Sequence, residues 1–253
     1  MENFNKFGFN WRVGRSWGLA HPNHICWCDS NCVDVRPDGI ILSIERNDKA
    51  FVTDKPEMWG KIKTYQWGVG YISSIETIKY GTLKIDFILP QGNHLWPAIW
   101  VTDGKTWPPE IDIVEAWSND IKGKHRYNRM WGCIPLPFVN RIFPGVVIGD
   151  CVNNKGYKSY TNIFKGTYPK CLNIDGVNTC ILHWQPHEIS IIWNGYIIAH
   201  EKDPDVLNWF NKSEGMEIHL NNYVTNDFTQ EDYNNLPSYN ASSLKILDLE
   251  YTK

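Results

Sequence analysis

Short apolar segments rich in β-branched and aromatic residues recur along almost the whole chain, and turn-forming residues separate them. This pattern is typical of β-strands, whereas helical periodicity is confined to residues 204–212. Asn194-Gly195 and Asp38-Gly39 lie between such segments, and both pairs favour a tight hairpin turn. The sequence predicts strands at 39–44, 68–74, 81–89, 98–102, 110–117, 178–185, 188–193, 196–200, 216–222 and 245–251.

The length and composition fit a single all-β domain. The chain has 253 residues, of which 42% are hydrophobic, and β-sandwiches of this size commonly fold as one unit. No internal repeat or linker divides the sequence, so we expect residues 1–253 to form one domain of two stacked antiparallel sheets. Residues 123–170 lack the strand pattern, and we expect long loops there that help to shape a binding site.

Charge and hydropathy exclude two classes of partner. The formal net charge of −3 argues against broad electrostatic binding to nucleic acid. No run of about 20 apolar residues is present, so we expect no membrane-spanning helix. The 13 Trp exceed what a core usually needs, because the indole is large and its N–H requires a partner. Flat aromatic surfaces suit the C–H faces of sugar rings, so the excess favours a carbohydrate partner.

The cysteines allow two interpretations. Seven Cys are present, so any set of disulfides leaves one thiol over. Cys26, Cys28 and Cys32 lie near His21 and His24, which is one way to build a zinc site. No second pair follows at finger-like spacing, so a loop with free or locally paired cysteines is the alternative.

The stretch WPPEIDIVEAW places three carboxylates on one predicted strand. Side chains alternate along a strand, so Glu110 and Asp112 share one face. Strict alternation would direct Glu115 into the core, where an unpaired carboxylate is costly. One extra residue at positions 113–114, a β-bulge, would return Glu115 and Trp117 to the face of the other acids.

Three like charges on one face repel one another, so their presence favours a chemical role over an ordinary solvent-facing strand. Retaining glycoside hydrolysis needs two carboxyl groups ~5–5.5 Å apart, one as nucleophile and one as acid/base. Glu110 and Glu115, on either side of Asp112, can meet this requirement. Asp112 can hydrogen-bond to Glu110 and help to set which group holds the proton. The pattern alone leaves the order of the roles open.

The acidic stretch from Glu110 to Glu115 resembles the signature of glycoside hydrolase family 16, in the β-bulge form associated with laminarinases, agarases, porphyranases and κ-carrageenases. Two positions depart from the family pattern. Pro109 stands where Gly is usual, which implies the start of a strand because Pro has no N–H, and Asp86 stands near a usual Glu. Further matching segments are YGTLKIDF at 80–87, LWPAIW at 95–100, WQP at 184–186 followed by Asn194-Gly195, and the closing strand at 244–252.

The resemblance implies a concanavalin A-like β-jelly roll with a concave substrate cleft across one sheet. It implies endo-acting hydrolysis of β-glycosidic bonds by double displacement, with Glu110 as nucleophile, Asp112 as helper and Glu115 as acid/base. This chemistry requires no cofactor. The substrate would be a polysaccharide, either a β-1,3-glucan or a galactan such as agar, porphyran or carrageenan.

Other residues are candidates for substrate contacts. Trp96, Trp107, Trp117 and Trp184 could stack on sugars, although core packing is the alternative for each of them. Asn221 matches a polar position on a cleft strand, where a structural hydrogen bond is an equal interpretation.

Two groups of residues suggest ions. Asp248 matches a position that holds a structural calcium ion in many family members, so such an ion is a further expectation. A basic run is either a solvated loop or a set of contacts to sulfate or carboxylate groups of a substrate. Its members are Lys122, Lys124, His125, Arg126 and Arg129.

Two other functions fit the same sequence. A non-catalytic carbohydrate-binding or virion-surface domain could share the fold, but it has no reason to keep three carboxylates on one strand. A transglycosylase would use the same residues, and only its products would differ. We expect a monomer that acts outside the cell. The first residues lack the apolar core of a secretion signal, so a signal removed upstream or release by lysis, as for a phage enzyme, would explain this location.

Overall fold

The computed structural model describes residues 3–21, 24–51, 63–105, 109–118, 139–142, 145–148, 158–160 and 176–253. Most of these residues lie in strands. The elements are β1 (Asn3–Lys6), β2 (Phe9–Val13), β3 (Cys26–Cys28), the 3-10 helix η1 (Ser30–Cys32), β4 (Val33–Arg36), β5 (Gly39–Leu42), β6 (Ile44–Phe51), β7 (Lys63–Val69), β8 (Tyr71–Ile78), β9 (Gly81–Ile88), β10 (Leu95–Thr102), β11 (Glu110–Ser118), β12 (Val139–Ile142), β13 (Gly145–Ile148), β14 (Lys158–Tyr160), β15 (Asn178–Gln185), β16 (Glu188–Trp193), β17 (Tyr196–Glu201), α3 (Pro204–Lys212), β18 (Met216–Val224), α4 (Gln230–Asn234) and β19 (Leu244–Thr252).

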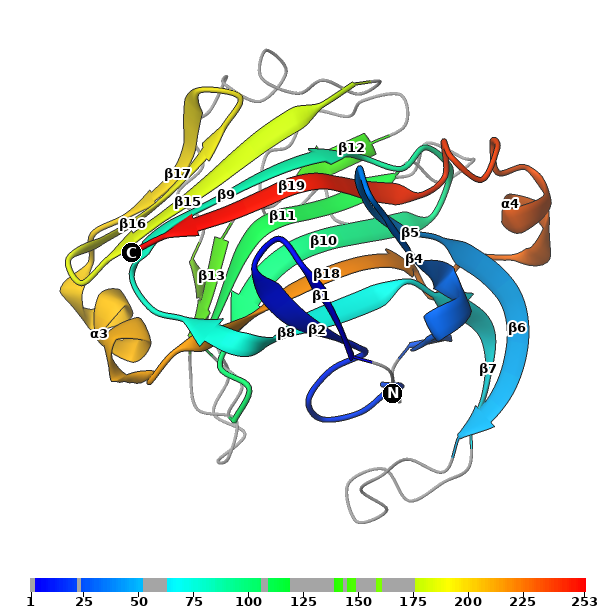
Figure 1. The fold of residues 1–253 in the computed structure, drawn as a ribbon, viewed down its shortest axis with the longest axis horizontal. Coiled ribbons are helices and arrows are strands. Elements are labelled where there is room, and N and C mark those ends of the chain that lie inside the picture. Colours follow the sequence, from blue (N-terminus) through cyan, green and yellow to red (C-terminus); the bar gives the residue numbers. More distant parts are fainter. Residues whose placement is uncertain are drawn as a thin grey trace.

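Two large antiparallel sheets make up the described part of the chain. The first has the order β1-β2-β8-β18-β10-β11-β13-β14, with β12 also paired to β11. The second has the order β17-β16-β15-β9-β19-β5-β4, and β3, β7 and β6 form a smaller sheet. Figure 1 shows the large sheets as two layers, and buried side chains from both form one hydrophobic core. The expected all-β sandwich of two antiparallel sheets is therefore confirmed.

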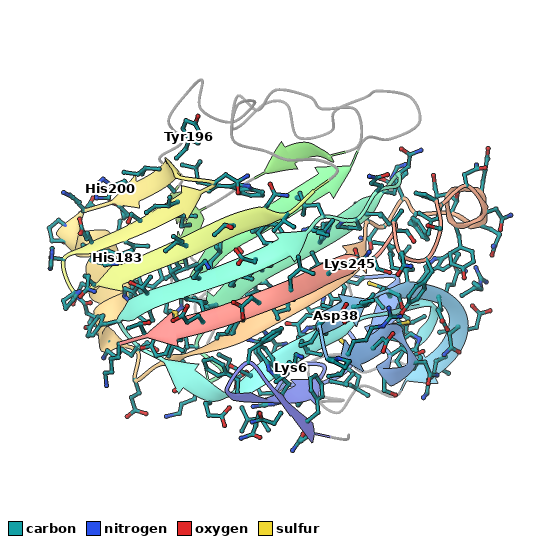
Figure 2. All side chains as sticks on the ribbon, turned by 45° about the horizontal axis from the view of Figure 1, so that its top comes forward. Lys6, Asp38, His183, Tyr196, His200 and Lys245 are labelled. Carbon is teal, nitrogen blue, oxygen red and sulfur yellow. The ribbon has the colours of Figure 1, made fainter. Side chains whose placement is uncertain are left out.

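Alternation along the strands builds this core. In β9 the side chains of Leu83, Ile85 and Phe87 are buried, and the residues between them are half-buried. Figure 2 shows the opposite face of the second sheet, where His183 stands on β15 and Lys245 on β19. The second sheet thus presents an apolar inner face and a polar outer face, as expected for a sandwich.

Trp184 belongs to the inner face. It follows His183 in β15, so its side chain points into the core, where it is 1% exposed and packs edge-on against Tyr80 at a centroid distance of 5.5 Å. A ring buried between the sheets cannot contact a polysaccharide. The expectation that Trp184 binds substrate is wrong, and its role is the alternative one of core packing.

Replacing this ring should therefore affect stability. We expect Trp184→Ala to lower the free energy of unfolding by about 3–5 kcal/mol, because it leaves a large cavity. Trp209→Ala, on α3, is the matched control, since Trp209 is 36% exposed and its loss should cost less than about 1 kcal/mol. Urea unfolding followed by fluorescence measures both changes, and equal losses would contradict the packing role.

The predicted strand at 68–74 is interrupted. β7 ends at Val69 and β8 begins at Tyr71, and the two belong to different sheets. At Gly70 between them, a Cβ would lie 2.5 Å from the Cys32 carbonyl oxygen and 2.6 Å from the Leu42 Cα. Only glycine fits this close crossing of backbones, so the chain changes sheets where the apolar pattern predicted one continuous strand.

The two predicted hairpin turns have different outcomes. Asn194 and Gly195 join β16 to β17 with φ angles of 47° and 84°, which confirms a turn with two positive φ values. Arg36 pairs with Gly39, so the turn between β4 and β5 consists of Pro37 and Asp38 instead. The prediction of an Asp38-Gly39 turn was shifted by one residue.

Residues 123–170 were expected to form long loops. The described parts of this region are three short strands, β12, β13 and β14, which extend the first sheet beyond β11. The predicted helix at 204–212 is confirmed as α3, which Asp203 caps by accepting a hydrogen bond from the Asp205 N–H. In the ranges given above, no helix is long and apolar enough to cross a membrane.

Candidate active site

A β-bulge at Ile113 shapes the strand that carries the acids. On β10, Ile99 pairs with Val114 and its neighbour Trp100 pairs with Asp112, so Ile113 has no partner of its own on that strand. One residue is therefore added to β11 relative to β10. The bulge lies at positions 113–114. It was predicted there because a regular strand would bury the carboxylate of Glu115 at a high free-energy cost.

The bulge sorts the side chains of β11. Glu110, Asp112 and Glu115 are all half-buried on the face that points away from the core. Pro109 directly precedes the strand, as its missing N–H had predicted. Its carbonyl accepts a hydrogen bond of 2.8 Å from the Thr102 hydroxyl. The remaining described side chains of the strand lie in the core with 0% exposure: Ile111, Ile113, Val114 and Ala116.

Crowding of the carboxylates shifts their protonation. Burial, followed by the negative charges of Glu110 and Glu115, raises the pKa of Asp112 well above its usual value. Burial, followed by the charge of Glu110, raises the pKa of Glu115 to about 8, although a hydrogen bond from Trp96 lowers it. At neutral pH, Glu115 therefore carries a proton that it can donate. A carboxyl group that stays protonated beside another acid is the usual sign of a general acid.

Trp96 lies beside this acid, and its predicted stacking on a sugar stays a prediction. Its indole N–H donates a 3.1 Å hydrogen bond to Oε1 of Glu115. Trp96 is half-buried on β10 and pairs with Tyr223 of β18. Ala98, two residues further along β10, pairs with Glu115 of β11. Trp96 thus contacts the acid directly, which the sequence had not indicated.

Trp100 also lies beside the acids, although it was not among the predicted site residues. It pairs with Asp112 across β10 and β11, is half-buried, and stacks on His219 with a centroid distance of 4.3 Å. Its N–H donates a 2.9 Å hydrogen bond to Asn221. The spacing in WPAIW was the available signal, because Trp96 and Trp100 share a face four residues apart on one strand.

Asn221 has a structural role in this arrangement. It is 2% exposed, accepts the hydrogen bond from Trp100, and donates one of 3.4 Å to the Trp96 carbonyl. Both contacts orient the aromatic residues beside the acids. The structural hydrogen bond, one of the two interpretations of Asn221, is present, and a contact of Asn221 with substrate stays a prediction.

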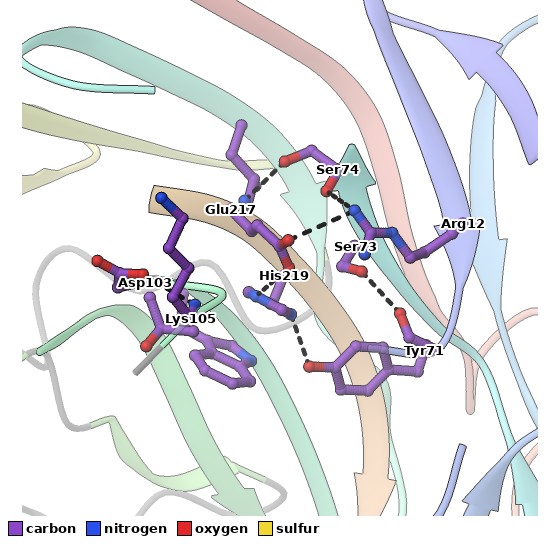
Figure 3. Close-up of polar contacts among 12 residues, drawn as sticks. Arg12, Tyr71, Ser73, Ser74, Asp103, Lys105, Glu217 and His219 are labelled. Atoms are coloured by element: carbon purple, nitrogen blue, oxygen red, sulfur yellow. Dashed lines mark hydrogen bonds and ion pairs between the residues drawn. The ribbon is translucent and has the colours of Figure 1, made fainter. Parts of the chain in front are cut away.

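His219, on which Trp100 stacks, belongs to a polar network that joins β18, β8 and β2. The Tyr71 hydroxyl lies 2.7 Å from Nδ1 of His219, and Glu217 lies 3.4 Å from Arg12 (Figure 3). Burial lowers the pKa of His219 well below its usual value, so its imidazole is neutral. These residues come from strands far apart in the sequence, and no local motif predicted that they would meet.

Several predicted residues fall outside the described side chains. Trp107 and the basic run lie outside the described residues, and Trp117 is described only as part of the backbone of β11. Their proposed contacts with substrate stay predictions. Asp248 is exposed and pairs with Asp86 across β19 and β9, and a calcium ion there also stays a prediction.

The cysteines predicted as possible zinc ligands are buried, and Cys26 and Cys28 belong to a hydrophobic cluster that also packs against Trp96 and Trp100. Cys26, Cys28 and Cys32 are buried free thiols. Burial raises the pKa of Cys26 to about 12 and that of Cys28 to about 11, which disfavours the thiolate form that zinc requires. No group of three or more His, Cys, Asp or Glu in the described residues could hold a metal ion.

Solved structures share this fold. An endo-1,3-β-glucanase (laminarinase) catalytic domain from Thermotoga petrophila is 14% identical, with a TM-score of 0.61 over 100% of this chain and 94% of its own. Porphyranase B from Zobellia galactanivorans is 12% identical, with a TM-score of 0.65 over 100% and 89%. The family 16 glycoside hydrolase of the Bacteroides ovatus mixed-linkage glucan PUL, in complex with a G4G4G3G product, is 16% identical, with a TM-score of 0.64 over 99% and 97%.

Neither a family model nor a curated protein sequence matches the chain. At such low identities the structural likeness shows the fold alone, which is the expected β-jelly roll. The chain thus resembles family 16 glycoside hydrolases in two respects, its sequence motifs and its fold.

Proposed function

We propose that this chain is a retaining glycoside hydrolase of the family 16 type, which cuts internal β-glycosidic bonds of a polysaccharide. The β-bulge in β11 carries the proposal, because it brings Glu110, Asp112 and Glu115 to one face while the residues between them stay in the core. The raised pKa of Glu115 supports its assignment as acid/base.

The reaction has two steps. In the first, Glu115 donates its proton to the glycosidic oxygen as the bond from that oxygen to the anomeric carbon breaks, and a carboxylate oxygen of Glu110 bonds to that carbon. In the second, Glu115, now ionised, takes a proton from a water molecule whose oxygen attacks the anomeric carbon. The bond to Glu110 then breaks, and the sugar leaves with its original anomeric configuration.

Asp112 keeps the two outer acids in different protonation states. Its pKa is raised by burial and by both neighbours, so it holds a proton that it can donate in a hydrogen bond to Glu110. Such a bond stabilises Glu110 as the ionised nucleophile. It also separates the charge of Glu110 from Glu115.

The substrate class follows from the aromatic surroundings and from the solved relatives. Trp96 and Trp100 are half-buried residues of β10, the strand that pairs with the acids of β11. Their rings can stack on sugar units on either side of the bond that is cleaved. Structural relatives include a β-1,3-glucanase, a porphyranase and a complex with a mixed-linkage glucan product. A β-linked glucan or galactan is the proposed substrate, met outside the cell or after lysis, by a monomer that needs no cofactor for catalysis.

The pKa of Glu115 predicts the alkaline limit of activity. The first step requires protonated Glu115, which is present below pH 8 and is lost above it. We therefore expect kcat/KM to fall about tenfold per pH unit above that point. Initial rates from pH 4 to 10 measure this limit. A decline that already begins near the ordinary glutamate pKa of about 4.3 would contradict the assignment.

The stereochemistry of the product tests the retaining mechanism. Proton NMR spectra recorded within minutes of adding enzyme should show the β-anomer first, before mutarotation produces the α-anomer. An α-anomer formed first would mean direct displacement by water, and Glu110 would then be a base rather than a nucleophile.

A further inference from the structure

Trp96 connects the candidate acid/base to the N-terminal part of the chain. Its indole N–H bonds to Oε1 of Glu115, while the edge of its ring meets His24 at a centroid distance of 5.6 Å. Tyr223 of β18 contacts the same ring at 6.1 Å. The position of the indole, and with it the direction of its N–H, depends on these two aromatic neighbours.

A buried arginine contacts Tyr223, one of these two aromatic neighbours of Trp96. Arg15 is 4% exposed, donates a hydrogen bond to the Tyr223 hydroxyl, and places its guanidinium 5.6 Å from the centre of that ring. The same guanidinium lies 5.1 Å from the centre of the Tyr71 ring. His24 packs edge-on against Tyr223 at 5.2 Å. Arg15, Tyr223 and His24 therefore form a continuous support for Trp96.

The contact with Trp96 makes the two oxygens of Glu115 different. Oε1 accepts the indole N–H, and a carboxyl oxygen that accepts such a bond is the poorer place for the acidic proton. The proton therefore resides on Oε2. A glycosidic oxygen must lie within hydrogen-bond reach of the proton it receives, so a fixed indole also fixes the direction of proton delivery.

We propose that His24, supported by Tyr223 and Arg15, is a positioning residue for the acid/base: it holds the indole of Trp96 so that Oε2 of Glu115 delivers the proton. This inference rests on the proposed function only for the catalytic role of Glu115. The sequence suggested only a zinc-ligand role for His24, whereas its contacts place it against Trp96 and Tyr223.

His24 acts through packing and not through charge. Burial, followed by the nearby His21, Arg15 and Lys63, lowers its pKa to about 3, and burial together with Arg15 and Lys63 lowers that of His21 to about 4. Both rings are therefore neutral where Glu115 titrates. Among the described residues, the acids that interact electrostatically with Glu115 are Glu110 and Asp112 of its own strand.

The titration of Glu115 itself tests the proposal without any substrate. Full-length protein carrying 13C-labelled glutamate carboxyls is titrated by NMR, and Glu115→Gln identifies the resonance. We expect Trp96→Phe to raise the pKa of Glu115 by about one unit, because a hydrogen bond to the ionised form is lost. His24→Ala should raise it by part of that amount, and His24→Phe, which restores a ring, should return it towards the wild-type value.

His200→Ala on β17 is the matched control, because His200 pairs with Glu188 in the second sheet, and it should leave the titration unchanged. An unchanged titration in Trp96→Phe would overturn the whole proposal. A shift in Trp96→Phe with none in His24→Ala would overturn the role of His24.

Kinetics separate this inference from the proposed function. If the wild type cuts a polysaccharide, His24→Ala should lower kcat several-fold with little change in KM, and His24→Phe should recover most of it. A rise in KM alone would show that His24 binds sugar and would overturn its positioning role. If the wild type cuts nothing while the titrations shift as expected, the proposed function fails and the contact with Glu115 stands.

Discussion

Glu110→Gln should abolish hydrolysis, with kcat falling roughly 10⁴-fold or more. The amide has nearly the same volume as the carboxylate but cannot attack the anomeric carbon, so the covalent intermediate does not form. New reducing ends released from the polysaccharide that the wild type cuts measure the loss.

Two controls separate this effect from misfolding. Gln has nearly the volume of Glu and removes the carboxylate whose charge raises the pKa of Asp112 and Glu115, so Glu110→Gln should unfold at the same temperature as the wild type or a higher one. Glu250→Gln changes an exposed glutamate on β19 and should keep full activity. If Glu110→Gln retains more than a few per cent of the wild-type rate, Glu110 is not the nucleophile.

Glu115→Gln should slow both steps, by about 10²–10⁴-fold on a polysaccharide. The loss should be smaller on an aryl glycoside, because a good leaving group needs no proton. The decline of activity above pH 8 should also disappear, since the titrating group has been removed.

Azide then distinguishes the roles of the two glutamates. Azide attacks a glycosyl-enzyme without help from a general base, so it should restore turnover of Glu115→Gln on the aryl glycoside and give a β-glycosyl azide. Rescue of Glu110→Gln with the β-product, and none of Glu115→Gln, would reverse the assignment. The test matters because the order of roles came from the family resemblance and not from the spacing of the acids.

The geometry of β11 could be predicted because a regular strand would bury one of its carboxylates, and a β-bulge avoids this burial. Strict alternation would have buried Glu115, and the bulge at Ile113 removes that cost. Burial of the apolar residues between the acids follows from the same geometry. The local sequence of this strand was therefore enough to predict both the bulge and the faces on which its side chains lie.

The support around the acids could not be predicted in this way. The residues that support the site come from segments far from β11 in the sequence, among them His219, Tyr71 and Arg15. Single polar or aromatic residues in such segments give no periodic signal. Trp184 was misassigned for a related reason. Periodicity shows that His183 and Trp184 point to opposite faces, but it does not show which face of β15 meets the other sheet.

Tertiary packing also decided where strands begin and end. The apolar run across Gly70 gave no sign of a change of sheet, because the crossing depends on the distant backbones of Cys32 and Leu42. The turn falls at Pro37-Asp38, one residue before its predicted position, because Arg36 of β4 pairs with Gly39 of β5.

Hydrolysis of a polysaccharide by the wild-type chain tests the proposed function most directly. Laminarin, lichenan, agarose, porphyran and carrageenans are each incubated with the wild type and with Glu110→Gln, and new reducing ends are counted. We expect that the wild type cuts at least one of these polymers and that Glu110→Gln cuts none. Binding of a polymer without cleavage by the wild type would contradict the account, and the chain would then be a carbohydrate-binding domain.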